Sequence, residues 1–198
     1  MYQVTPPNVK ELLQKEKQQP TDMAKPFKFA KAVNVNINPL TYGKWMMNNG
    51  FAYWTLKILA DSASSLNISF SKFRLTKNAI MYISNGEGTM ITGPITSSEN
   101  NPNNYWGSDV YSGNAILIEI KVPIEEKDSL ILETKSIVYG YKPIFNTESG
   151  GFGQSASCNI NILCPEGTPW ENERKSVCKI LNADGSSWCS GAMIMNTC

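Results

Sequence analysis

Five cysteines are the residues of this sequence whose types and spacing best suit chemistry, and all of them lie in the last 41 residues. Thiolates bind metals, attack electrophiles or form disulfides. The spacings contain no Cys-x-x-Cys pair and the 198-residue chain has no histidine, so we expect neither a metal site nor a cofactor. Disulfide formation is the better interpretation, and the odd number of cysteines leaves at least one thiol without a partner in the chain. The candidate disulfide cysteines are Cys158, Cys164, Cys178, Cys189 and Cys198.

The absence of histidine also excludes Ser-His-Asp and Cys-His catalysis by this chain alone. The carboxylates of Glu125, Glu126 and Asp128 lie in one charged turn instead of facing each other across a pocket. We therefore predict no catalytic residue within these 198 positions.

A binding surface is the other chemistry that the sequence allows. Tyr105 and Trp106, in the loop from Asn100 to Gly107, can offer rings to stack on a sugar, flanked by asparagine donors and acceptors. The alternative is that these aromatics fold back over the open end of a core. Asn67-Ile68-Ser69 matches a glycosylation sequon but falls inside a predicted strand.

Charge and hydropathy limit the partners. Lysine and arginine total 18 against 17 acidic residues, so there is no net field to attract nucleic acid. No apolar run approaches the roughly 18 residues of a membrane helix, so we expect no membrane insertion. The first residues have no apolar core of signal-peptide type. Because disulfides need an oxidising compartment, we expect a secreted, extracellular or periplasmic protein whose signal peptide is absent from this numbering.

The N-terminal region, residues 1–31, is predicted to be a short helix and a linker. Residues 7–19 fit a helix that Asn8 caps together with Glu11 and that Pro20 ends. Phe27 and Phe29 are candidate docking points in the linker.

Residues 32–145 alternate apolar and polar side chains in short segments separated by turn formers, with no helical period between them. This pattern predicts an all-β domain, an antiparallel β-sandwich or jelly roll. The apolar positions of the expected strands are Val33, Val35, Ile37; Trp54, Leu56, Ile58; Leu66, Ile68, Phe70; Ile80 to Ile83; Ile116, Ile118, Ile120, Val122; Leu130, Leu132; and Ile137, Tyr139, Tyr141.

The composition changes again after this domain. Residues 146–157, rich in glycine and serine, are predicted to be a linker. Residues 158–198 contain two apolar stretches, Val177–Leu181 and Ala192–Met195, separated by a turn that includes Asp184-Gly185. This arrangement predicts a C-terminal β-hairpin.

Two motifs in residues 158–198 resemble the amino-terminal stretch of mature bacterial lysyl endopeptidases and their trypsin-like relatives. The first is the family's Cys-Asn-x-x-x-x-Cys-Pro-Glu-Gly, matched from Cys158 to Gly167. The second runs from Trp188 to Ile194 and is similar to the strand that leads toward the catalytic histidine. Segments such as 52–58, 79–83, 92–95 and 138–141 resemble the accessory region that precedes the protease in such precursors.

The resemblance implies a secreted serine endopeptidase precursor with the sandwich as pro- or accessory domain. Residues 158–198 would begin an incomplete trypsin-like barrel, whose partner is the remainder of the protease domain. The catalytic groups, the lysine-reading pocket and the family's partners for Cys158, Cys164 and Cys189 would all lie beyond Cys198, so the chain is expected to be inactive as given. Cys178 and Cys198 depart from the family pattern. The alternative, from a different class, is a stand-alone module that binds a glycan or cell-surface component through Tyr105 and Trp106.

Overall fold

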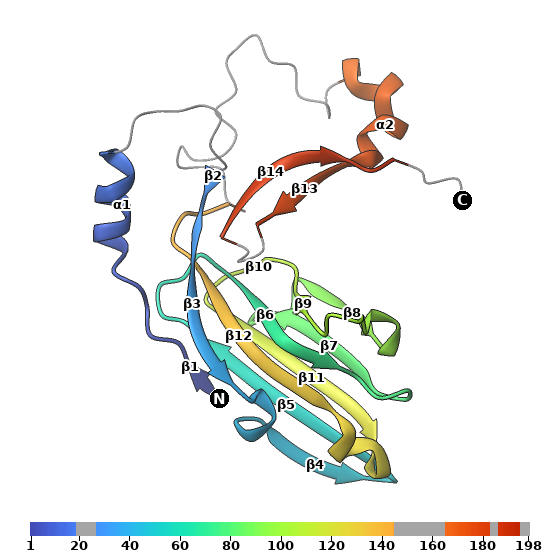
Figure 1. Ribbon diagram of the computed structural model, residues 1–198. Coiled ribbons are helices and arrows are strands. Elements are labelled where there is room, and N and C mark those ends of the chain that lie inside the picture. Colours follow the sequence, from blue (N-terminus) through green and yellow to red (C-terminus); the bar gives the residue numbers. More distant parts are fainter. Residues whose placement is uncertain (19–26, 145–164, 183–185, 195–198) are drawn as a thin grey trace.

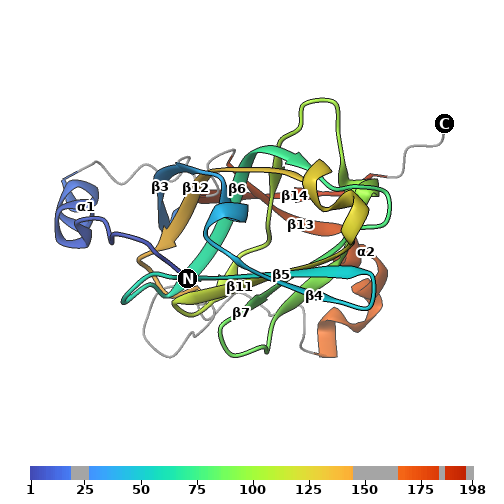
Figure 2. The same cartoon turned by 90° about the horizontal axis from the view of Figure 1, so that it is seen from below.

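A computed structural model of the chain describes residues 1–18, 27–144, 165–182 and 186–194. Its largest part is a sandwich of two β-sheets, with a short helix beside it and a separate hairpin above it in the view of Figure 1. Figure 2 shows the two layers, with β3, β12 and β6 in one and β5, β11 and β7 in the other. The predicted all-β sandwich with a short N-terminal helix is therefore confirmed.

The first sheet has six strands in the order β1-β5-β11-β7-β8, and β4 also pairs with β5. All its pairs are antiparallel except β1 with β5. The strands are β1 (Tyr2–Gln3), β4 (Lys44–Asn48), β5 (Phe51–Leu59), β7 (Ile80–Asn85), β8 (Ile91–Ile95) and β11 (Ala115–Pro123).

The second sheet has five strands in the order β10-β6-β12-β3, with β9 also pairing with β6. Its strands are β3 (Ala30–Ile37), β6 (Ser65–Arg74), β9 (Trp106–Gly107), β10 (Tyr111–Ser112) and β12 (Ile131–Gly140). Three 3-10 helices, η1 (Pro39–Thr41), η2 (Ser97–Glu99) and η3 (Ile124–Ser129), lie in the connections.

The core lies between the sheets and is made by the alternate apolar positions that the sequence suggests. Trp54, Leu56 and Ile58 of β5 are buried, and so are Ile68 and Phe70 of β6 in the facing sheet. Each such side chain contributes about 1.5–3 kcal/mol by leaving water. A single-residue slip of either strand would turn this set outward, so burial fixes the register.

One expectation about the strands is wrong. Leu130–Leu132 and Ile137–Tyr141 were expected to be two strands, but residues 131–140 form the single strand β12. Its pairing with β6 shifts register between Glu133 and Thr134 and again between Thr134 and Ser136. Such bulges interrupt the period of two without ending the strand, so the sequence pattern looks broken where the strand continues.

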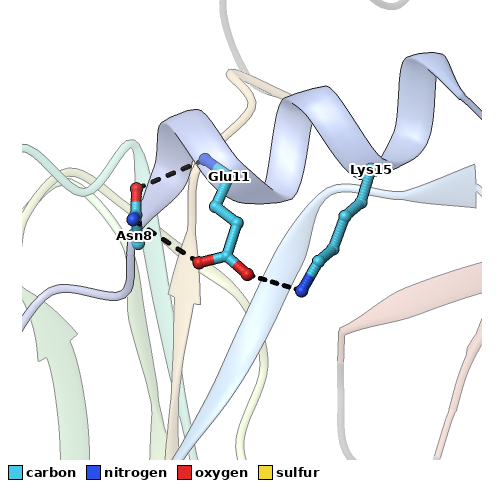
Figure 3. Close-up of polar contacts among 3 residues, drawn as sticks. All are labelled: Asn8, Glu11 and Lys15. Carbon is cyan, nitrogen blue, oxygen red and sulfur yellow. Dashed lines mark hydrogen bonds and ion pairs between the residues drawn. The ribbon is translucent and has the colours of Figure 1, made fainter.

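Helix α1 (Val9–Lys17) begins where the sequence predicts a cap. The backbone N–H of Glu11 donates to Asn8 Oδ1 at 3.2 Å, and Asn8 Nδ2 donates back to Glu11 Oε2 at 3.5 Å (Figure 3). Lys15 Nζ lies 2.5 Å from Glu11 Oε1 one turn later. The bond from the Glu11 N–H satisfies one of the N-terminal donors that the helix leaves open, and the two side-chain contacts support it.

The C-terminal segment forms η4 (Pro165–Trp170), α2 (Glu171–Ser176), β13 (Val177–Leu181) and β14 (Ser187–Ala192). The predicted hairpin is present, but its second strand is Ser187–Ala192 instead of the apolar stretch Ala192–Met195. Pairing of Val177 with Ala192 and of Leu181 with Trp188 sets that register. The predicted linker 146–157 and the Asp184-Gly185 turn lie outside the described residues. Among the described residues, no helix has the length and apolar character needed to cross a membrane.

Candidate functional site at the junction of sandwich and hairpin

Part of the outer face of the second sheet is unusual because it is buried. Ser65, Asn67 and Ser69 of β6 alternate with the core residues and point away from the first sheet, yet all three are buried. Ser136 and Val138 lie beside them on β12 and are also buried. A sandwich sheet normally exposes this face to water, so something must cover it.

The cover comes from both ends of the chain. A small second cluster of buried residues consists of Phe29, Ala30 and Val138. Among the side chains that pack against it are Phe27, from the segment before β3, and Leu181, from the hairpin. The hairpin is therefore packed on the sandwich by apolar contact.

Backbone hydrogen bonds attach the same hairpin. Strand β2 (Phe27–Lys28) pairs with β14 and completes a three-stranded sheet in the order β13-β14-β2. The carbonyl of Ser186 accepts the N–H groups of Phe29 and Ala30, both at 3.2 Å. The carbonyl of Phe29 accepts the N–H groups of Tyr141 and Lys142 at 3.0 and 3.1 Å. Phe29 thus lies where the hairpin sheet meets the sandwich.

A polar cluster joins helix α1 to this junction. Lys142 Nζ donates to the carbonyl of Lys28 at 2.8 Å and lies 2.6 Å from Glu16 Oε2 and 5.0 Å from the centre of the Phe27 ring. The hydroxyl of Tyr141 donates to Glu16. Lys142 therefore holds α1, β2 and the end of β12 together.

The charges of this cluster shift two pKa values. Burial acts to raise the pKa of the Glu16 carboxyl, but hydrogen bonds from Lys142 and Tyr141 and the lysine charges outweigh it, so this pKa is lowered. The pKa of the Tyr141 phenol is raised by burial and by the neighbouring Glu16 carboxylate. The lowered pKa keeps the Glu16 carboxylate charged at neutral pH, and the raised pKa keeps the Tyr141 phenol neutral.

A cavity of about 260 Å³ lies between the outer face and the hairpin. Asn67 is 4% exposed, and its Oδ1 has no hydrogen-bond partner in the part of the chain that the structure describes. The residues that line the cavity are Asn67, Ser69, Tyr105, Gly107, Ser108, Leu181 and Asn182.

Tyr105 and Trp106, the two residues predicted to form a binding platform, have different surroundings in the structure. The ring of Trp106 lies 5.0 Å from that of Phe73, with 18° between the planes, and 6.0 Å from that of Phe70. It packs against the core, as the fold-back alternative expects. Tyr105 instead lines the cavity, with Lys135 Nζ 5.9 Å from its ring centre.

Of the five cysteines, the structure describes two. Cys178 and Cys189 are unpaired thiols on the same face of the hairpin, opposite Gly191 and Ile180 respectively. No disulfide links the described residues, and Cys158, Cys164 and Cys198 lie outside them. In residues 1–18, 27–144, 165–182 and 186–194 there is also no group of three or more potential metal ligands.

Sequence reasoning missed the buried outer face, although a signal was present. The outward positions of β5 and β11 include Lys57, Glu119 and Lys121, long charged residues typical of a solvated face. The outward positions in the first half of β6 are Ser65, Asn67 and Ser69, which are too short to reach past a covering layer. Asn67 also belongs to the sequon Asn67-Ile68-Ser69, and at 4% exposure within β6 it is out of reach of a glycosylating enzyme in the folded chain.

The fold and junction define an all-β sandwich protein that carries a docked C-terminal hairpin. Residues 152–198 match the family model described as lysyl endopeptidase, C-terminal domain. The match covers less than a quarter of the chain and includes the whole hairpin, so it is the C-terminal segment that is similar to lysyl endopeptidases. No solved structure matches the chain.

Proposed function

We propose that this chain is the non-catalytic, N-terminal part of a secreted serine endopeptidase precursor, in which the sandwich is the pro- or accessory domain of a lysyl endopeptidase-like enzyme. Residues 158–198 would supply the first strands of the protease domain. The observation that carries the proposal is the docking of the hairpin, which belongs to the matched segment, on β2 and on the sandwich.

The geometry supports a role in assembling the protease. A two-stranded hairpin is marginally stable alone, and a third strand with an apolar contact stabilises it. Here β2 supplies the strand and the Phe29 cluster supplies the contact. In the precursor the sandwich would hold the first protease strands in register until the remaining strands pack on them.

The exposed face of the hairpin fits this role. Ile180 is 50% exposed, and it shares its face with Cys178 and Cys189. An apolar face of this kind is normally covered in a finished domain. The remainder of the protease domain is the partner that would cover it and offer partners for the thiols.

An immunoblot with an antibody against the sandwich tests the precursor proposal in the organism that carries the gene. We expect a newly made product larger than 198 residues and, outside the cells, a shorter fragment that contains the sandwich. A product of only 198 residues that stays inside the cells would contradict the proposal.

The assembly role has its own test. Lys142→Ala removes the bond to the Lys28 carbonyl and the pair with Glu16, so it should lower the yield of secreted lysine-specific endopeptidase activity. Lys121→Ala is the matched control, because Lys121 lies over the Phe51 ring on the other sheet. Equal yields from both variants would argue against an assembly role.

A second candidate, a stand-alone carbohydrate- or surface-binding module, keeps one supporting observation. Tyr105 lines a cavity with polar groups, whereas Trp106 packs into the core. Such a module would therefore bind its ligand with the Tyr105 ring beside the cavity, without Trp106.

A further inference from the structure

The cavity at the junction is assembled from three separate parts of the chain. Asn67 and Ser69 come from β6, Tyr105, Gly107 and Ser108 from β9 and its flanks, and Leu181 and Asn182 from the end of β13. A ligand in this cavity would therefore touch both the sandwich and the hairpin.

The charge of the lining restricts the ligand. None of the seven lining residues carries a charged side chain. Transfer of an ion from water into such a site, with no opposite charge to meet it, is costly. The site therefore suits a neutral ligand.

Asn67 supplies the strongest indication of what the ligand must offer. Asn67 lines the cavity, and its buried Oδ1 has no donor among the described residues. Buried acceptors in folded proteins are nearly always hydrogen-bonded. A ligand that fits here brings an O–H or N–H group to this oxygen.

The two serine hydroxyls add further acceptors. Ser108 Oγ accepts the Ile68 N–H at 3.0 Å and donates its proton to the Asp109 carbonyl at 2.8 Å, which leaves one lone pair. Ser69 Oγ lies 2.7 Å from Ser136 Oγ and keeps at least one lone pair whichever atom donates. Three oxygens of lining residues, Asn67 Oδ1 and the two serine Oγ atoms, therefore keep acceptor capacity, which suits a ligand that brings several O–H donors.

Tyr105 and Leu181 give the same cavity an aromatic and an aliphatic wall. A pyranose has a C–H face that packs on such walls and a rim of hydroxyl groups that meets acceptors. We infer that the cavity binds one neutral sugar residue, with a hydroxyl donating to Asn67 Oδ1 and the ring beside Tyr105. This inference does not depend on the protease proposal, and it rests on the second candidate function, for which it names a site and a ligand class.

The experiment is an NMR titration of the full chain with the methyl pyranosides of glucose, galactose, mannose and N-acetylglucosamine. N-acetylglycine methylamide serves as the peptide probe. We expect saturable shifts of the Asn67, Gly107 and Asn182 amide signals with at least one pyranoside, at a Kd on the order of 1 mM, which is typical of so small a ligand.

Two variants locate the site. Asn67→Leu removes the unpaired oxygen and should weaken binding at least about tenfold. Gly107→Leu should block the cavity without disturbing the fold, because a Cβ at Gly107 meets no atom within 4 Å and its φ lies outside the left-handed region. Gly107 pairs with Ser69 in β6, so the new side chain projects on the cavity side. Thr134→Val is the matched control, because it removes another buried, unpaired oxygen that lines a different cavity.

The outcomes of this titration distinguish a sugar from a polypeptide segment as the occupant of the cavity. Binding that both Asn67→Leu and Gly107→Leu weaken and that Thr134→Val leaves unchanged supports the sugar site. Absence of saturable shifts with every pyranoside, or binding unchanged in Gly107→Leu, overturns it. Binding of the peptide probe without any pyranoside would also overturn it and assign the cavity to a polypeptide segment.

Discussion

The carboxylate of Glu16 lies 2.6 Å from the ammonium group of Lys142, and this half-buried pair ties helix α1 to the end of β12. The helix has no buried residue, so contacts at its surface must fix its position. Glu16 reaches the end of β12 through Lys142 and Tyr141, and Val9 packs against the core of the sandwich.

Glu16→Gln should release helix α1 from the sandwich at a cost of about 1 kcal/mol. The effect depends on pH. Because the folded state lowers the pKa of Glu16, the pair contributes fully above the unfolded pKa of about 4.3 and is lost as pH falls through the lower folded pKa. Amide exchange of residues 9–17 as a function of pH measures how firmly helix α1 is held. Glu11→Gln is the control, because Glu11 pairs only within the helix. Equal protection in the two variants would refute the role of Glu16.

Leu181→Ala should undock the hairpin from the sandwich. Leu181 packs against the Phe29 cluster, and its truncation should cost about 1–2 kcal/mol, which raises amide exchange rates in β14 roughly tenfold. Ile180→Ala, one residue earlier on the exposed face, should have little effect. If the two variants exchange alike, the hairpin is not held by this contact.

Gly140→Ala tests the closeness of β12 to β6. A Cβ on Gly140 would lie 2.0 Å from Ser65 Oγ and 2.9 Å from the Ser65 carbonyl oxygen, so the strands must separate. We expect a loss of about 1–3 kcal/mol in urea unfolding. Gly107→Ala, where a Cβ meets nothing within 4 Å, should be nearly neutral and serves as control.

Trp106→Ala should lower stability without changing the cavity lining. Its ring stacks on Phe73, and removal of so large a side chain from the edge of the core should cost about 2–3 kcal/mol. Trp106→Phe should restore part of that loss. Unchanged urea unfolding of Trp106→Ala would show that the ring is not part of the core. It would then favour the hypothesis that Tyr105 and Trp106 together bind a ligand.

The sequence was sufficient to predict the sandwich, because burial between two sheets imposes a period of two. The alternation at Trp54, Leu56 and Ile58 and at Leu66, Ile68 and Phe70 places strands β5 and β6 correctly. The cap at Asn8 is also local, since its partner lies three residues away. Such features need no knowledge of distant contacts.

The junction was beyond sequence reasoning because it depends on long-range pairing. Phe27 and Lys28 form a strand only because β14 lies beside them, more than 150 positions later in the chain. The sequence suggests Phe29 as a docking point. Its backbone hydrogen bonds with Ser186 and Tyr141, however, follow only from the fold. The cavity was hidden for the same reason, since its lining combines three remote segments.

The pairing of β2 with β14 has a consequence for any maturation of this chain. The hairpin is joined to the sandwich twice, once through the covalent chain and once through non-covalent strand pairing and the Leu181 contact. Cutting the chain between residues 145 and 164 would remove only the first connection. Cleavage and release would then be separate events, and the time between them would be set by how fast the three-stranded sheet opens.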